Sequence, residues 1–168
     1  MQNKPVWLPD LVRLVDYNGN WEKYLEAIYE FFRQDFVENR PSFRGVRLSL
    51  KRHPVIQGKE ATFWHLVSEG KYEPDRLPDL RRCERIKWPR PIIEAGEQEP
   101  TLKVWENERD GETRICLWFS LEDEDYLVVL AKRNNYLLMW TAYPLTYPNT
   151  KRKLQKEYEA YKAGAALS

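Results

Sequence analysis

The chain contains few of the residues that build metal centres and disulfide frameworks. Its 168 residues include only two histidines, His53 and His65, and two cysteines. Cys83 and Cys116 do not form a CxxC pair, so a disulfide framework and a cysteine-based zinc site are both unsupported. An HExxH motif is also missing, and a closed structural zinc site is therefore not expected.

Phosphate-cradling loops and long apolar runs are missing as well. The sequence has no GxxxxGK[ST], GxGxxG or GxSxG motif. It has no run of about 18 apolar residues, and its amino terminus lacks the pattern of a cleaved signal. We expect a cytoplasmic protein with no membrane contact and no cofactor. One metal alternative stays open, a carboxylate-only magnesium site built from Glu69, Asp79, Glu84 and Glu94.

The composition that remains is that of one globular domain. Hydrophobic residues make up 42% of the chain and aromatic residues 14%, including seven Trp and ten Tyr. This is enough apolar surface for a core, and the length suits a single domain over 1–168. The aromatic rings either fill that core or stack on a ligand such as a nucleobase. The net charge of +1 indicates no partner by itself.

Periodicity predicts a mainly helical part over about 1–95. Apolar residues recur at helical spacing over 20–38, with Asn20 as the cap. A strand is expected over 43–51, where polar and apolar residues alternate. Two more helices are expected, over 59–69 and over 79–86, and the residues Trp88 to Pro91 cannot continue the second.

The second part, over about 100–163, predicts four strands and a closing helix. Strands over 102–108 and 113–119 flank Asp110-Gly111, a strong hairpin signal. Strands over 125–132 and 136–143 flank a second turn at 133–135, and a helix follows over about 149–162. Because helices and strands are segregated, we expect an α+β fold with helices packed on a four-stranded antiparallel meander.

His65 is the first candidate for chemistry. Thr62, His65 and Glu69 share one face of the predicted helix, and a glutamate one turn away favours the charged imidazole, which suits acid–base work. The structural alternative is a histidine that only hydrogen-bonds at a helix surface. His53 precedes Pro54 and is expected to be extended, with a structural role or a surface phosphate contact.

A basic run is the second candidate. The segment RRCERIKWPR carries Arg81, Arg82, Arg85, Lys87 and Arg90, which can bind phosphates or form a solvated helix face. Lys59 lies near His65 in the sequence. The closing helix, with Lys151 and Arg152, offers a second phosphate-binding surface.

The third candidate is WTAY at 140–143. Thr141 and Tyr143 are two residues apart on a strand, so they project to the same side. They either bind a phosphate or base, or are simply good strand formers. Together, a histidine, a carboxylate, arginines and strand-borne hydroxyls are what metal-free RNA cleavage by the ribose 2′-OH requires.

Three strings carry a resemblance: KRHPVIQGKEATFWH, DLRRCERIKWPRPIIE, and WTAY followed by KLQKEYEAY. They resemble a little-characterised bacterial family associated with mobile elements and phages. The order of elements also resembles the barnase–EndoU–colicin–RelE class of ribonuclease toxins. That resemblance implies a metal-independent endoribonuclease, often restrained by an antitoxin or immunity protein.

The resemblance implies the roles of individual residues as well. His65 would match the helix-borne catalytic position of the class and Thr141 or Tyr143 the late-strand one, while Lys59, Arg81 and Arg82 would supply positive charge. Two alternatives remain open. One is a non-enzymatic module of a mobile element that binds nucleic acid or protein, and the other is an immunity-type partner that recognises another protein through its aromatic surface.

Overall fold

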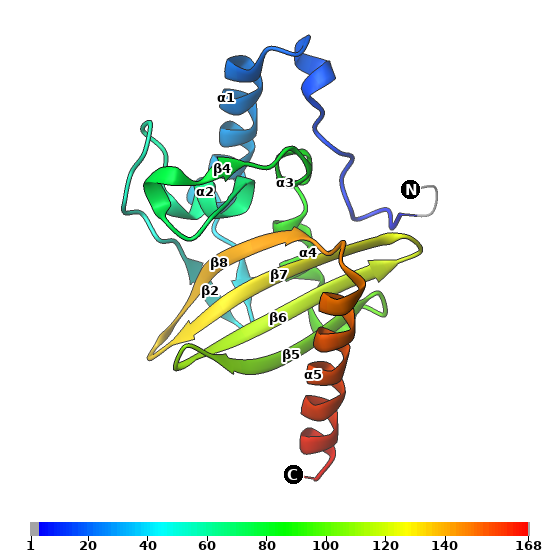
Figure 1. Ribbon diagram of the computed structural model, residues 1–168. Helices are drawn as coiled ribbons and strands as arrows, with labels where there is room; N and C mark the ends of the chain where they lie inside the picture. Colours follow the sequence, from blue (N-terminus) through cyan, green and yellow to red (C-terminus); the bar gives the residue numbers. More distant parts are fainter. Residues whose placement is uncertain (1–3, 168) are drawn as a thin grey trace.

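A curled mixed sheet lies at the centre of the molecule (Figure 1). The computed structural model describes residues 4–167. Within them, six strands follow the order β1-β2-β8-β7-β6-β5. Their bounds are β1 (Ser42–Phe43), β2 (Val46–Ser49), β5 (Leu102–Arg109), β6 (Glu112–Leu121), β7 (Glu124–Arg133) and β8 (Tyr136–Pro144). The α+β class is confirmed.

The sheet has two strands more than the expected four-stranded antiparallel meander, and one of its pairings is parallel. Arg44 and Gly45 both have positive φ angles (52° and 77°) and split the predicted 43–51 strand into the hairpin β1–β2. β2 then pairs parallel with β8, through Leu48 opposite Leu137. The alternation in this segment predicted a strand, but its partner lies far away in the sequence.

The two predicted hairpins are confirmed. Asp110 and Gly111 have φ angles of 55° and 74°, the left-handed pair that a tight hairpin turn requires. Arg109 and Glu112 close that turn between β5 and β6. Arg133 and Tyr136 close the turn between β7 and β8, so β7 extends one residue beyond its predicted end.

Five α-helices occur among the described residues, together with a short two-stranded ribbon. They are α1 (Trp21–Phe32, continued by a π-helical turn over Arg33–Glu38), α2 (Ala61–Val67), α3 (Leu80–Glu84), α4 (Pro89–Ala95) and α5 (Pro148–Leu167), with the ribbon formed by β3 (Ser68–Glu69) and β4 (Leu77–Pro78). The predicted 20–38 helix and its cap are confirmed, because Asn20 Oδ1 accepts a hydrogen bond from the Lys23 amide at 3.1 Å.

Several helix boundaries differ from the prediction. The predicted 59–69 helix begins at Ala61, the 79–86 helix spans Leu80–Glu84, and the closing helix continues past 162 to Leu167. The 59–69 helix ends at Val67, since Ser68 is extended (φ −140°, ψ 168°) and pairs with Pro78 across the ribbon. A new helix, α4, begins at Pro89, where the sequence indicated only a stop. At the first position of a helix the backbone N–H has no partner within the helix, so proline, which lacks this N–H, can start a helix although it cannot continue one.

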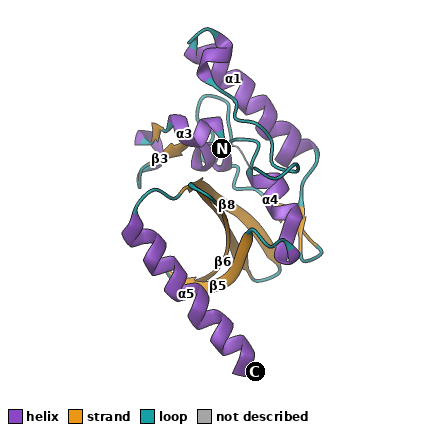
Figure 2. Cartoon of the chain, turned by 90° about the vertical axis from the view of Figure 1, so that its right-hand side faces the viewer, coloured by secondary structure: helices purple, strands orange, loops and turns teal. Residues whose placement is uncertain are grey.

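The sheet buries both of its faces. One face packs against α2, α3 and α4, and α1 packs on α2 through Phe32 and Phe63. Together they form the larger core, which also includes Phe119. The other, concave face packs against α5 through Trp105 and Leu154. Figure 2 shows α5 beside the β5 edge of the sheet. In residues 4–167, no helix combines the length and apolar character needed to cross a membrane.

Candidate functional site

His65 lies in α2 and points toward β8. Its side chain is buried, with the residue only 6% exposed. Nε2 lies 2.7 Å from Oε1 of Glu73, and Nδ1 lies 3.3 Å from the backbone oxygen of Trp140. The indole ring of Trp140 contacts the imidazole edge-on, with centroids 5.2 Å apart. Both ring nitrogens of His65 therefore face oxygen acceptors.

The expected support of His65 by Glu69 is wrong. Because α2 ends at Val67, Glu69 is not one helical turn beyond His65 but lies exposed on β3. The carboxylate that reaches the imidazole is that of Glu73, in a short 3-10 turn. Glu73 Oε1 also accepts a hydrogen bond from Lys51 Nζ at 3.0 Å. The histidine thus has a carboxylate partner, though a different one.

The charge states of this pair follow from their surroundings. Burial lowers the pKa of the His65 imidazole, and the hydrogen bond to Glu73 opposes that shift. Partial burial acts to raise the pKa of the Glu73 carboxyl, but the hydrogen bonds from His65 and Lys51 outweigh it and lower that pKa. Near neutral pH the pair is therefore a neutral imidazole that donates Nε2–H to a carboxylate.

A β-bulge positions the predicted strand residues. Val129 pairs with Thr141 and Leu130 with Met139, which leaves Trp140 as the extra residue on β8. Thr141 Oγ1 donates a hydrogen bond to the backbone oxygen of His65 at 2.9 Å. The bulge therefore joins β8 to α2 twice, through this bond and through the Trp140 carbonyl that faces the imidazole.

Arg82 joins α3 to the same place. Its Nη1 atom donates to the backbone oxygen of Ser68 at 2.7 Å and to that of His65 at 3.3 Å. Its guanidinium lies 5.1 Å from the ring centroid of Tyr143. Thr141 and Arg82 thus both contact His65, through its main chain and not its ring.

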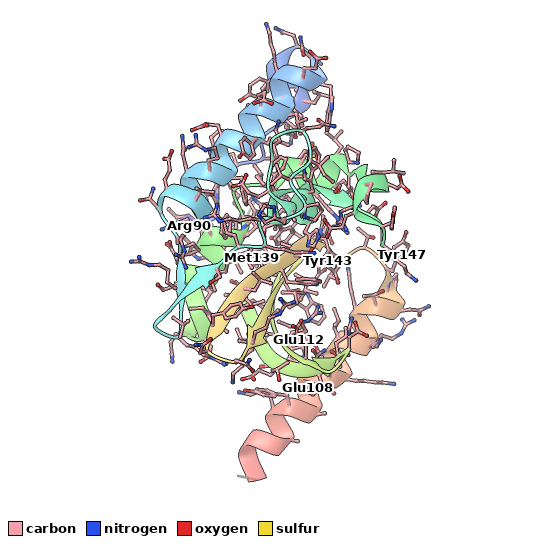
Figure 3. All side chains as sticks on the ribbon, turned by 90° about the vertical axis from the view of Figure 1, so that its left-hand side faces the viewer. Arg90, Glu108, Glu112, Met139, Tyr143 and Tyr147 are labelled. Carbon is pink, nitrogen blue, oxygen red and sulfur yellow. The ribbon has the colours of Figure 1, made fainter. Side chains whose placement is uncertain are left out.

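The neighbouring Arg81 has a different environment. Its side chain is exposed, while its amide is held by Asp79, which caps α3 with Oδ1 at 2.9 Å. Arg81, Arg82, Tyr143, Glu69 and Asp79 line a cleft of about 430 Å³ between α3 and the connection from β8 to α5. We call this the arginine cleft. In Figure 3, Tyr143 lies where the sheet meets the helices, and Tyr147 lies farther out on that connection.

Most of the other predicted phosphate contacts are engaged within the protein. Lys59 is buried and pairs with Glu26 at 2.7 Å. Arg85 is buried as well, and its Nε atom lies 2.7 Å from Oε1 of Glu124. Since each cation already has a carboxylate partner, a structural role explains its position.

The rest of the basic run consists of Lys87, in the turn between α3 and α4, and Arg90, in α4. Lys87 Nζ lies 4.8 Å from the ring centroid of Phe31, and Arg90 Nε pairs with Glu94 at 2.7 Å. The run therefore spreads over several surfaces and forms no single basic face. Only Arg81 and Arg82 from it line the arginine cleft.

The two predicted phosphate contacts of α5, Lys151 and Arg152, lie in its first turns. Lys151 Nζ lies 2.9 Å from Oδ2 of Asp125, and Arg152 contacts the Asn149 side chain in its own first turn. Burial acts to raise the pKa of the Asp125 carboxyl, but hydrogen bonds led by that from Lys151 lower it. Lys151 therefore stabilises the packing of α5 on the sheet.

A second cavity lies between the concave face of the sheet and α5. It measures about 270 Å³ and shares Tyr143 with the arginine cleft. We call it the sheet hollow. Its lining comes from β5, β6, β7, β8 and α5, and consists of Asn107, Arg109, Arg114, Cys116, Leu127, Val129, Trp140, Thr141, Tyr143 and Leu154. Neither His65 nor Glu73 lines it.

Several residues of this region escape sequence reasoning. Glu73 lies in the connection between β3 and β4, after α2 has ended, so no helical or strand spacing relates it to His65. Lys51, which follows β2 and precedes α2, also reaches Glu73, and no sequence spacing predicts this contact. Trp140 could have been suspected, since it belongs to WTAY, but only the bulge turns its ring toward the imidazole.

The side chains that could ligate a metal ion are dispersed in the described structure. Within residues 4–167, no group of three or more His, Cys, Asp or Glu side chains is placed to hold a metal ion. The four acidic residues of the magnesium alternative therefore do not gather. Comparisons of the chain with family models, curated protein sequences and solved structures returned no match.

Proposed function

We propose that this protein is a metal-independent endoribonuclease of the toxin or effector type. The observation that carries the proposal is the meeting of His65, Arg82 and Thr141, which come from α2, α3 and β8. Residues far apart in the sequence converge on one histidine, and that histidine has a carboxylate partner in Glu73. A histidine–carboxylate pair beside arginine and hydroxyl groups suits attack by a ribose 2′-OH.

The proposed reaction needs no added nucleophile. The neutral imidazole of His65 accepts the 2′-OH proton at Nδ1, while Glu73 keeps its hydrogen bond with Nε2–H and stabilises the imidazolium that forms. The 2′ oxygen bonds to phosphorus while the bond to the 5′ oxygen breaks, which gives a 2′,3′-cyclic phosphate. Burial raises the pKa of the Tyr143 phenol, so this group stays protonated and can donate the proton that the leaving 5′ oxygen needs.

Positive charge for the phosphate comes from the arginine cleft. Arg82 already has its guanidinium over Tyr143, and Arg81 is exposed beside it. Such side chains stabilise a crowded, negatively charged transition state. Since the His65 ring is buried and its Nδ1 atom faces the Trp140 carbonyl oxygen at 3.3 Å, the proposal also requires this contact between α2 and β8 to open when RNA binds.

The test is a cleavage assay with the purified chain and total RNA in EDTA. The expected result is fragments ending in 2′,3′-cyclic phosphate, which disappear with His65→Ala. His53→Ala is the matched control, because His53 is the other histidine of the chain and lies exposed. Intact RNA with the unmodified protein removes the proposal, and so does cleavage that occurs only when magnesium is added.

A binding protein without catalysis is the second candidate, favoured by the burial of the His65 ring. In this case the arginine cleft holds an RNA strand, with Arg81 on phosphate and Tyr147 available for stacking. Binding would then fall with Arg81→Ala and stay unchanged with His65→Ala. Expression in a bacterium separates the two, since only a nuclease toxin arrests growth in a way that His65→Ala relieves and a cognate antitoxin suppresses.

A further inference from the structure

The sheet hollow has the size and the chemistry of a pocket for a single planar ring. Its volume of about 270 Å³ is at the small end of ligand pockets, which span about 300–1,000 Å³. Leu127, Val129 and Leu154 supply apolar contacts, and the rings of Trp140 and Tyr143 supply aromatic ones. Such a lining favours a flat, largely apolar group over a sugar or a free phosphate.

One buried acceptor in this lining has no partner. Asn107 Oδ1 is buried and, within residues 4–167, makes no hydrogen bond. The orientation of its amide is set from α5, because Nδ2 donates to Oε2 of Glu157 at 2.8 Å. Oδ1 is therefore held on the opposite edge of the amide. A buried acceptor left unpaired costs about 1–3 kcal/mol, so a ligand N–H donor there would recover stability.

The cationic side chains of the hollow are paired. Arg109 and Arg114 both line it, and Arg109 Nη2 lies 3.5 Å from Oε1 of Glu157. Arg114 lies with its guanidinium 4.6 Å from the Trp140 ring centroid, and its Nε atom pairs with Glu112 at 2.7 Å. Burial raises the pKa of the Cys116 thiol to about 12, so this side chain adds no negative charge. The lining therefore carries paired charges and suits a neutral planar ring such as a nucleobase.

We infer that the sheet hollow binds one unstacked nucleobase of an RNA strand, with a base N–H donating to Asn107 Oδ1. The inference rests on the proposed action on RNA, and it adds the place where a base is held. Thr141 and Tyr143 line the hollow, and Thr141 also bonds to the His65 carbonyl. A base in the hollow therefore brings its ribose and phosphate to the edge of the His65 site. Aromatic and Arg contacts with single unstacked bases are a common mode of RNA recognition.

The experiment measures binding without cleavage. The full chain is titrated with a tetradeoxyadenylate, which lacks the 2′-OH, and with an abasic strand of the same length. Binding is followed by tryptophan fluorescence and calorimetry. We expect the base-bearing strand to bind about tenfold more tightly than the abasic one. Asn107→Leu should remove most of this difference and leave the affinity for the abasic strand unchanged.

Two further variants protect the test from misfolding. Cys116→Phe fills the hollow from β6 without changing Asn107, and it should also abolish the preference for the base-bearing strand. Asn134→Leu, at an exposed position in the β7–β8 turn, should change nothing. Thermal unfolding verifies that each variant is folded. Equal binding of the two strands by the unmodified protein overturns the inference, as does a full base preference in Asn107→Leu or Cys116→Phe.

Failure of this inference can be told apart from failure of the proposed cleavage. If RNA is cut but the base preference is missing, the base pocket is wrong and the nuclease stands. If the base preference depends on Asn107 but RNA stays intact, the pocket stands and the protein is a binding module. If the chain neither cuts RNA nor binds either strand, both are wrong.

Discussion

Oε1 of Glu73 lies 2.7 Å from Nε2 of His65, and the same oxygen accepts a hydrogen bond from Lys51. This carboxylate is the charged acceptor of the buried His65 imidazole. The pair connects the stability of the fold to pH and, in the proposed function, to the protonation state of the reacting base.

Acidification should destabilise the protein through His65. Its pKa in the folded chain lies below the ordinary value, so between about pH 6.5 and that lower value the unfolded chain binds the extra proton. Stability is therefore lost as the pH falls through this window. Urea unfolding of His65→Gln should show a flatter dependence on pH there, whereas His53→Gln should keep that of the unmodified chain.

The comparison must be made between variants, because Asp35 acts in the opposite direction. Burial raises the pKa of the Asp35 carboxyl to about 6, so the folded chain takes up that proton first and gains stability as the pH falls. The difference between His65→Gln and the unmodified protein cancels this contribution. An unchanged pH dependence in His65→Gln contradicts the burial argument.

Glu73→Gln should weaken both the fold and the proposed reaction. It removes an ionic hydrogen-bond acceptor shared by His65 and Lys51, at a cost of about 1–2 kcal/mol in unfolding free energy. Without the carboxylate the pKa of His65 falls further, so the acidic limb of RNA cleavage should move to lower pH. Glu69→Gln is the matched control, since Glu69 is exposed and should change stability by no more than about 0.5 kcal/mol. A limb that does not move would exclude Glu73 as the partner of a reacting base.

Substitution of Arg82 should lower the stability of the fold, whereas substitution of Arg81 should lower the affinity for RNA. Arg82→Met removes hydrogen bonds to the carbonyls of His65 and Ser68 and the contact with Tyr143, and should cost about 2–4 kcal/mol. Arg81→Met should leave the urea midpoint nearly unchanged, because its side chain is exposed, and should reduce RNA affinity. Equal stability losses in the two variants would show that the contacts of Arg82 do not stabilise the fold.

Thr141→Val tests the link between β8 and α2. Valine keeps the β-branched shape but leaves the His65 carbonyl without its hydroxyl donor, at a cost of about 1 kcal/mol measured by thermal or urea unfolding. Thr141→Ser retains the hydroxyl and should recover most of that loss. If valine and serine behave alike, the hydroxyl does not hold α2 against the sheet.

Local patterns were sufficient for most elements of the fold. The Asp110–Gly111 hairpin, the Asn20 cap and the long helices follow from turn chemistry and periodicity, which depend on neighbours in the sequence. The parallel pairing of β2 with β8 does not, because it depends on contacts between residues about 90 positions apart in the chain. The start of α4 at Pro89 was missed because proline can both stop and start a helix.

The sequence by itself determined which side chains are available: two histidines, a basic run and a hydroxyl-bearing strand in an α+β chain. Only the tertiary structure decided how they are used. The early end of α2 replaces Glu69 with Glu73, and the bulge at Trp140 turns that ring toward His65. Packing also buries Lys59 and Arg85 in ion pairs and leaves Arg81 exposed. Periodicity reports the faces of single elements, whereas a site depends on how those faces meet.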